Sequence, residues 1–370
     1  MPRYRVTFPH MGAGTVVVQS FLTELGFEVV LPPPTSQETL SLGSRHTPEF
    51  ACLPLKVNLG NYLQTIGDGV DAVFMAGGIG PCRFGLYGEV QREILRHLGH
   101  DLPFIVFEPP RKSLTELTSS VTRFLGMRFW RNLPRATFIG LKKALAIDRV
   151  ERRVAALAPH LPLASRRRIW DSKRAFLAGL SQAASVREID RLFVEKMDEF
   201  AALPKEPPED KLRVKIVGEL LVVMEPAINF HLEERLSMMG VEVERTILFF
   251  DWIRDNIFYS ALGLDWQKSL RALAKPYLAH YVGGHGLESV AHTVAAARDG
   301  TDGVIQLAPL GCMPEVIAMG ILQKAARDKQ LPVLSLLLDE HTAETGVLTR
   351  LEAFVDLMRN KREIMGGKGR

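Results

Sequence analysis

Cysteine is scarce in this chain. Its 370 residues include three cysteines, Cys52, Cys82 and Cys312. No two of them form a Cys-x-x-Cys pair, so the usual closely spaced zinc motif is absent. Each lies in a stretch that also contains glycine or proline, whereas a buried structural cysteine usually replaces alanine or valine inside a strand or helix. The three thiols therefore predict a site, and three converging thiolates would hold a metal centre with one coordination position open.

Long hydrophobic runs are also missing. No apolar run approaches the roughly 18 residues that span a bilayer. Residues 1–8 predict a strand and lack the apolar stretch of a signal peptide. With 46% hydrophobic and 24% charged residues, the chain predicts a globular protein with room for two domains. We therefore expect a cytoplasmic protein that contacts no membrane and keeps its thiols reduced.

Acidic residues are rare in one segment. Between Arg111 and Arg174, Lys and Arg number 16 and Asp and Glu number 4, a local balance of +12 that leaves −8 for the rest of the chain. Such a segment can receive an acidic partner protein or the phosphates of a nucleotide-like ligand, and solvated Arg-rich helix faces explain it equally well. Interleaved aromatic residues and an RNA-binding motif are lacking, so we expect no nucleic-acid partner.

What the chain does contain is an internal duplication. A helix end, a glycine and a strand occur at 22–30 and again at 236–244. Gly26 and Gly240 provide the left-handed residue after each helix. Continuous apolar strands then follow in the same order in both halves, at 70–76 and 102–108 in the first and at 301–307 and 331–339 in the second. Such strands indicate parallel sheets that are covered by helices on both faces.

The sequence thus predicts an α/β fold of two duplicated parallel-sheet, Rossmann-like lobes with a helical insert between them. We place the first lobe at 1–110, the basic helical insert at 111–205 and the second lobe at 206–370. The insert carries apolar residues at helical spacing, and a Pro-rich charged linker at 203–210 is its clearest boundary.

Cys82 and Cys312 occupy matching places in the two halves, just past an apolar strand and near the start of the next helix. Open α/β sheets keep their chemistry at that edge, and a helix N-terminus favours the thiolate that binds metal. Two lobes that face each other would bring these positions together in a cleft. Cys52 has no counterpart in the second half, so we expect it to be the asymmetric third ligand. Three cysteines without an obvious fourth ligand favour a [4Fe–4S] cluster over zinc, although the spacing alone leaves both open.

A glycine-rich loop at 76–82 leads from a predicted strand to a predicted helix. It is not a Walker loop, because no Gly-Lys-Ser/Thr follows, and it is not the dinucleotide fingerprint, which follows the first strand. Backbone N–H groups in such a loop can cradle phosphate or donate hydrogen bonds to the sulfides of a cluster. We therefore select Gly78, Gly80 and Arg83 as cofactor-binding candidates.

His285 and Glu315 are the catalytic candidates. His285 lies in a second glycine-rich loop, which we expect to open a helix at Glu288. It would act as an acid or hydrogen-bond donor in the cleft, or would simply satisfy loop carbonyls. Glu315 follows Cys312 by three residues and is either a helix-dipole partner or a group that supports the metal ligands.

Several motifs together resemble one family. They are residues 7–12 (Thr-Phe-Pro-His-Met-Gly), 49–56 (Glu-Phe-Ala-Cys-Leu-Pro-Leu-Lys), 77–85 (Gly-Gly-Ile-Gly-Pro-Cys-Arg-Phe-Gly) and 349–354 (Thr-Arg-Leu-Glu-Ala-Phe). On these motifs the chain resembles the 2-hydroxyacyl-CoA dehydratase superfamily and, within it, the acyl-CoA dehydratase activase-related branch. That branch is similar to the D-component of 2-hydroxyglutaryl-CoA dehydratase and to double-cubane cluster proteins. The resemblance covers nearly the whole chain except the basic insert.

The resemblance implies an oxygen-sensitive iron–sulfur protein in which Cys52, Cys82 and Cys312 bind one [4Fe–4S] cluster. Family members receive low-potential electrons from a separate ATP-hydrolysing, ASKHA-type activator. They then drive radical dehydration of a 2-hydroxyacyl-CoA or reduction of a small molecule. The resemblance also implies a homodimer or a heterodimer with a homologous subunit, and a double-cubane cluster would need ligands shared across a dimer.

No nucleotide-binding pattern of the activator class occurs in this sequence, so we expect the chain to receive the electrons, as a dehydratase-like or reductase-like component. Two other functions stay open at this point. One is a cluster-carrying scaffold or maturation factor. The other is a metal-free, two-lobed module that closes on a small ligand.

Overall fold

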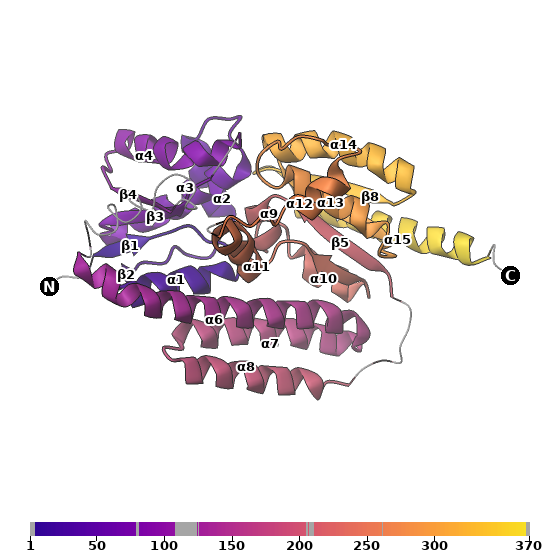
Figure 1. Ribbon diagram of the computed structural model, residues 1–370, viewed down its shortest axis with the longest axis horizontal. Helices are drawn as coiled ribbons and strands as arrows, with labels where there is room; N and C mark the ends of the chain where they lie inside the picture. The colour runs from indigo at the N-terminus through magenta and orange to yellow at the C-terminus, as the bar shows by residue number, and fades with distance from the viewer. Residues whose placement is uncertain are drawn as a thin grey trace. The chain divides into compact units, whose positions relative to one another are not determined.

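The computed structural model describes residues 4–78, 81–107, 124, 126–204, 206, 211–260 and 262–367. The chain divides into two compact units. Unit 1 comprises Met1–Arg149, Arg174–Lys196 and Leu248–Trp266, and unit 2 comprises Val150–Lys173, Met197–Ile247 and Gln267–Arg370. Each unit contains one four-stranded parallel sheet, which confirms the predicted α/β fold with two duplicated lobes (Figure 1). The domain boundaries at 110 and 205 stay a prediction.

The sheet of unit 1 has the strand order β2-β1-β3-β4. Its strands are β1 (Arg5–Thr7), β2 (Glu28–Val29), β3 (Ala72–Ala76) and β4 (Phe104–Phe107). The helical segments between them are α1 (Gly14–Leu25), α2 (Gln37–His46), α3 (Leu53–Thr65), η1 (Ile66–Asp68), η2 (Arg83–Leu86) and α4 (Tyr87–His97).

Helices cover both faces of this sheet. The neighbouring strand residues Ala72 and Val73 belong to different buried clusters. Ala72 packs with Leu22 of α1, and Val73 packs with Tyr62 of α3 and Leu95 of α4. Because successive strand side chains point to opposite faces, α1 covers one face and the pair α3 and α4 covers the other.

Unit 2 repeats this order as β6-β5-β7-β8. Its strands are β5 (Arg213–Gly218), β6 (Glu242–Arg245), β7 (Gly303–Pro309) and β8 (Val333–Leu338). Its helices after β5 are α9 (Leu220–Met224), α10 (Leu232–Met238), α12 (Lys268–Ala274), α13 (Gly286–Ala296), α14 (Met313–Lys329) and α15 (Glu344–Gly367). The short helix α11 (Phe249–Ile253) and the π-helical turn η4 (Arg254–Tyr259) follow β6 in the chain but belong to unit 1.

The two sheets repeat each other down to single hydrogen bonds. In unit 1 the backbone N–H of Arg5 donates to the Asp71 carboxylate at 2.7 Å. In unit 2 the backbone N–H of Arg213 donates to the Asp302 carboxylate at 2.7 Å. The N–H of each aspartate donates in return to the carbonyl of its arginine. These matched pairs at the start of the central strands confirm the duplication.

The glycine after the helix that precedes each edge strand has the predicted left-handed conformation. The φ angle is 114° at Gly26, after α1, and 77° at Gly240, after α10. A residue with a Cβ atom would be strained at these angles, whereas glycine is not. The chain can therefore turn directly into β2 and β6.

The insert is helical where the structure describes it. It contains α6 (Met127–Leu157), the 3-10 turn η3 (Ala158–His160), α7 (Leu163–Gln182) and α8 (Val186–Ala201). In Figure 1, α6, α7 and α8 run alongside one another. Residues 108–123, and residues 205 and 207–210 of the predicted linker, lie outside the described residues.

Several basic side chains of the insert are buried. In unit 1, Lys143 of α6 is 1% exposed and donates to the hydroxyl of Ser20 at 2.6 Å. In unit 2, Lys173 of α7 pairs with the buried Glu151 at 2.9 Å, and Arg245 of β6 pairs with the same carboxylate. Burial opposes the ionisation of Glu151, but Arg245 and Lys173 outweigh it and hold its pKa at about 2.

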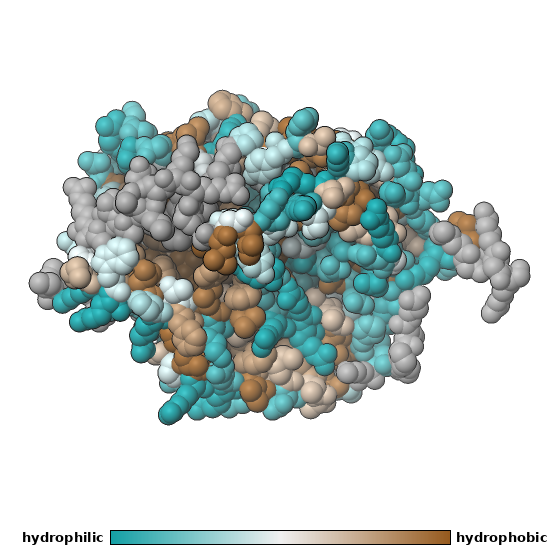
Figure 2. Space-filling view, in the orientation of Figure 1, coloured by the Kyte–Doolittle hydropathy of each residue, from teal (hydrophilic) through white to brown (hydrophobic). Residues whose placement is uncertain are grey.

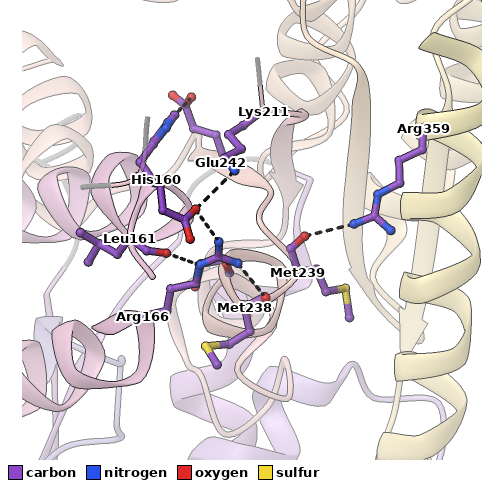
Figure 3. A network of polar contacts seen from close by, with 10 residues as sticks. His160, Leu161, Arg166, Lys211, Met238, Met239, Glu242 and Arg359 are labelled. Carbon is purple, nitrogen blue, oxygen red and sulfur yellow. Dashed lines mark hydrogen bonds and ion pairs between the residues drawn. The ribbon is translucent and has the colours of Figure 1, made fainter. Parts of the chain in front are cut away.

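Arg166 of α7 joins the insert to the sheet layer within unit 2 (Figure 3). Its guanidinium donates to the carbonyls of Leu161 at 2.8 Å and Met238 at 3.0 Å. Because Met238 ends α10, the cation stabilises the negative end of that helix dipole. Some of the basic residues of the insert therefore form contacts inside unit 2 instead of lying on a solvated helix face.

Each unit contains buried apolar clusters. In unit 2, one buried cluster joins the central strands to the helix that precedes β7 and comprises Val217, Ala296, Val304 and Leu331. Hydrophilic residues cover much of the face shown in Figure 2. Among the described helices, none combines the length and the apolar character that crossing a bilayer requires.

Candidate functional site

All three cysteines are N-cap residues. Cys52 precedes α3, Cys82 precedes η2 and Cys312 precedes α14. In α3 and α14 the second helical position is a proline, Pro54 and Pro314, whose missing N–H costs no helix hydrogen bond there. Cys82 follows β3 and Cys312 follows β7, at the carboxyl edges of the two sheets. The N–H groups and positive dipole end of a helix start favour a thiolate.

Helix α3, which begins after Cys52, is held closely by α2. A Cβ atom added to Gly43 would lie 1.8 Å from the carbonyl oxygen of Lys56. One added to Gly60 would lie 2.0 Å from the carbonyl oxygen of Thr39. Only glycine permits so close an approach of two backbones. The position of Cys52 in unit 1 is therefore set by backbone contact between two helices.

Tyr87, the first residue of α4, contacts the Cys52 sulfur. Its hydroxyl forms a hydrogen bond with Cys52 Sγ, and both side chains are buried. Burial raises the pKa of Tyr87 far above its usual value, the Cys52 and Cys82 thiols add to this rise, and Arg83 opposes it. Both thiols and the Arg83 guanidinium therefore lie near enough to act on the phenol electrostatically. Unit 1 thus places the Tyr87 phenol directly against Cys52, although no sequence pattern marked Tyr87 as a site residue.

The glycine-rich loop before Cys82 has a packing role. A Cβ atom added to Gly78 would lie 2.9 Å from the Phe84 ring. The Arg83 guanidinium donates to the carbonyl of Phe50 at 3.4 Å, which links this loop to the residues before Cys52. Gly80 lies outside the described residues. Cofactor binding by Gly78, Gly80 and Arg83 stays a prediction.

His285 caps α13 in unit 2 as Cys52 caps α3 in unit 1. Helix α13 precedes β7 just as α3 precedes β3, so these two residues stand at corresponding helix starts. The residue at the position that corresponds to Cys52 is therefore a histidine, and the role of Cys52 as the asymmetric third ligand stays a prediction. The helix begins at Gly286, two residues before the predicted start at Glu288.

The starts of α13 and α14 meet within unit 2. A Cβ atom added to Gly286 would lie 2.5 Å from the carbonyl oxygen of Pro314. The residues that cap these two helices are His285 and Cys312. Unit 2 therefore presents an imidazole and a thiol at two helix starts that touch each other.

Glu315 lies fully buried just behind these helix starts. The Ser289 hydroxyl of α13 reaches both carboxyl oxygens of Glu315 at 3.1 Å, and Gln306 Nε2 of β7 donates to Oε2 at 2.9 Å. The Ser335 hydroxyl of β8 donates to Gln306 Oε1 at 2.8 Å. This network joins β7, β8 and α13 to the first turn of α14.

A second acid, the half-buried Glu219, acts electrostatically on Glu315. Burial raises the pKa of Glu315 to about 7; hydrogen bonds from Gln306 and Ser289 and the charge of His285 oppose the rise, and Glu219 adds to it. Burial also raises the pKa of Glu219, the N-cap of α9 directly after β5. Unit 2 thus brings together His285, Glu315 and a third group, Glu219. Glu219 was not among the predicted site residues, although its place directly after the apolar strand β5 marks it as a candidate.

No three side chains of His, Cys, Asp or Glu form a metal-binding group among the residues that the structure describes. Cys52 and Cys82 belong to unit 1, and Cys312 belongs to unit 2. The three-cysteine ligand set therefore stays a prediction.

Residues 10–77 match the family model described as a CoA enzyme activase uncharacterised domain. The matched segment runs from the loop after β1 to the residue after β3 and includes Cys52 and all of α3. This description agrees with the activase-related branch that the motifs resemble. Curated proteins give no match to the chain. The narrower similarity to the dehydratase D-component stays a prediction.

Proposed function

We propose that this chain is the electron-accepting iron–sulfur component of a CoA-enzyme system, with Cys52, Cys82 and Cys312 as ligands of a [4Fe–4S] cluster. The observation that carries the proposal is that every cysteine of the chain is the N-cap of a helix, and that the Cys52 sulfur bonds to a buried phenol. The match of residues 10–77 to a family model described as a CoA enzyme activase domain also supports the proposal.

The donor set suits such a cluster. Cysteine thiolates are its usual protein ligands, and nearby hydrogen-bond donors tune its potential. Each helix start provides N–H groups beside its cysteine. Three thiolates leave one iron without a protein ligand. When bound, the cluster would supply one-electron transfer and a Lewis-acidic iron.

Within this proposal, Glu315 and His285 handle protons. A carboxyl group with a pKa of about 7 is present in both protonation states at neutral pH, which general acid–base catalysis requires. Dehydration of a 2-hydroxyacyl-CoA needs a proton for the leaving hydroxyl group, and reduction of a small molecule also consumes protons. Glu315 would hold that proton on its carboxyl oxygen. The His285 side chain, which is 14% exposed, would exchange it with solvent.

The electrons would come from a separate ATP-hydrolysing activator of the ASKHA type. Exposed basic residues of the insert, such as Arg167 and Arg168 of α7, would receive an acidic surface of that partner. The active form would be a homodimer or a heterodimer with a homologous subunit.

The first test is the iron and acid-labile sulfide content of protein purified without oxygen. We expect about four of each per chain, as in one [4Fe–4S] cluster, and none in a variant with all three cysteines changed to alanine. Each single Cys→Ser variant should lose the cluster, while Tyr62→Phe, which removes a hydroxyl from the same unit, should keep it. Full iron retention in Cys312→Ser would remove Cys312 from the ligand set.

The second test adds activator and ATP to the iron-loaded protein and follows the electron paramagnetic resonance signal of the reduced cluster. A new signal that requires ATP supports the electron-accepting function. A cluster that passes to an apo-acceptor and is never reduced indicates a scaffold or maturation factor instead. Near-zero iron after reconstitution overturns the proposal and favours the metal-free ligand-binding module.

A further inference from the structure

We propose that Tyr87 is a positioning residue for Cys52, whose hydroxyl holds the Cys52 sulfur at the start of α3 and raises the reduction potential of the cluster bound there. The effect on the potential rests on the proposed function. The hydrogen bond itself does not, because it is a direct contact between two side chains of the chain.

Tyr87 is held by one contact at its hydroxyl and another at its ring. Its hydroxyl meets Cys52 Sγ, and its ring lies 5.5 Å from the Phe84 ring in the turn that follows Cys82. Tyr87 is 4% exposed and Cys52 is 8% exposed, so little water competes for either group. Tyr87 opens α4 while Cys52 caps α3, so this bond links the starts of two helices across 35 residues of chain.

The phenol is the donor in this pair. A thiolate has no proton to donate and a phenol is neutral at pH 7, so the Tyr87 O–H points a positive dipole at the sulfur whenever Cys52 is a thiolate. A cluster gains negative charge when it accepts an electron, and part of that charge lies on its cysteine sulfurs. A hydrogen bond to such a sulfur stabilises the reduced state more than the oxidised one and therefore raises the potential.

The chain contains a matched control, Tyr62 of α3. It lies in the same unit, is fully buried, and among the described residues its hydroxyl has no hydrogen-bond partner. Tyr62→Phe therefore removes the same atom as Tyr87→Phe, from an equally buried ring, without touching a sulfur. If the two variants differ in reduction potential or stability, the difference comes from the lost bond to Cys52, because both variants lose a phenol hydroxyl.

The first experiment measures the midpoint potential of the iron-loaded protein by spectroelectrochemistry. Tyr87→Phe should keep its iron and show a lower potential than the native protein, whereas Tyr62→Phe should leave the potential unchanged. An unchanged potential in an iron-loaded Tyr87→Phe protein, or an equal shift in both variants, would overturn the tuning role.

The second experiment uses the metal-free chain in a double-mutant cycle of Tyr87→Phe and Cys52→Ala, read by urea denaturation. Tyr87→Phe should lower the midpoint when Cys52 is present. It should leave the midpoint unchanged or raise it when Cys52 is alanine, because the hydroxyl then has no sulfur to bind. Additive effects would show that Tyr87 does not hold Cys52. If no variant binds iron, the proposed function fails, and this cycle still decides whether Tyr87 positions the sulfur.

Discussion

The carboxyl edges of the two sheets are built alike and carry different chemistry. Strand order, the Arg–Asp pair at the first central strand and the left-handed glycine are the same in both units. In unit 1 the edge carries two thiols and a phenol, Cys52, Cys82 and Tyr87. In unit 2 it carries the Cys312 thiol, the His285 imidazole and two acids, the buried Glu315 and the half-buried Glu219. The duplication therefore repeats the backbone frame, while the side chains that meet at the edge have diverged.

The clearest divergence is at the helix that precedes the third strand of each sheet. Its N-cap is Cys52 in unit 1 and His285 in unit 2. The neighbouring interior differs as well, because unit 2 contains the buried Glu315, and the charge of the half-buried Glu219 adds to the rise of its pKa. Within the proposed function, unit 1 is specialised for holding sulfur ligands and unit 2 for holding a proton beside the remaining thiol.

The largest expected effect concerns a close contact between two helices in each unit, α2 with α3 in unit 1 and α13 with α14 in unit 2. Gly43→Ala would drive a Cβ atom into the Lys56 carbonyl and should cost about 3 kcal/mol or more, because two backbones must separate. Gly286→Ala meets the Pro314 carbonyl at 2.5 Å and should cost about 1–3 kcal/mol. Urea denaturation measures both.

Gly320→Ala of α14 is the control, since an added Cβ atom meets nothing within 4 Å there. It should stabilise the chain by roughly 0.5–1 kcal/mol, because alanine favours a helix interior. A Gly43→Ala protein as stable as this control would contradict the close contact between α2 and α3.

The insert has a buried lysine in each unit, and the two lysines have different partners: Lys173 of unit 2 faces a carboxylate and Lys143 of unit 1 faces a hydroxyl. Lys173→Met should cost on the order of 3 kcal/mol, because it leaves the Glu151 carboxylate buried with one cation fewer. Lys143→Met should change stability by less than about 1 kcal/mol, because Lys143 faces the neutral Ser20 hydroxyl and burial already lowers the pKa of Lys143 to about 8. Equal losses in the two variants would show that neither charge is specifically paired.

The pH dependence of stability should depend on Glu315 of unit 2. Between the ordinary glutamate pKa of 4.5 and about 7, the folded chain keeps a proton on Glu315 that the unfolded chain has released. Stability should therefore fall as pH rises through this window, by up to roughly 3 kcal/mol, and this contribution should stay constant above it.

Glu315→Gln should remove this contribution, so that the variant gains stability relative to the native chain as pH rises from 5 to 8. Glu352→Gln, an exposed position on α15, serves as the control and should leave the pH profile unchanged. Urea midpoints at several pH values test this. Parallel profiles for native and Glu315→Gln proteins would mean that Glu315 is ionised throughout.

Local sequence patterns were enough to predict most of the frame. Apolar runs at 70–76 and 301–307 became β3 and β7, and the glycines after α1 and α10 took the predicted left-handed turn. Cysteine positions relative to strands were also predictable, because a strand end followed by a helix start is a local feature. The sequence predicts a helix start at Glu288, whereas α13 begins at Gly286 and His285 is its N-cap. The start of α13 touches the start of α14, a contact that no local pattern shows.

The partners of the candidate residues depend on contacts between distant segments. Tyr87 follows Cys82 by five residues, and nothing in its neighbourhood marks it as a partner of Cys52. The bond forms because α3 and α4 pack on the same face of the sheet, which brings their first turns together. Glu219 reaches Leu307 of β7 because β5 and β7 are adjacent in the sheet although they lie far apart in the chain.

The sequence by itself determined the α/β class, the doubled strand order and the scarcity of thiols. These follow from hydrophobic periodicity, glycine conformation and composition, which act over a few residues. Only the tertiary structure decided which side chains share a buried environment: the phenol at Cys52, the hydrogen-bonded acid Glu315 behind Cys312, and the insert lysines that face a hydroxyl in one unit and a carboxylate in the other. Hydrogen bonds and pKa values depend on burial and on neighbours brought close by folding, so no local pattern encodes them.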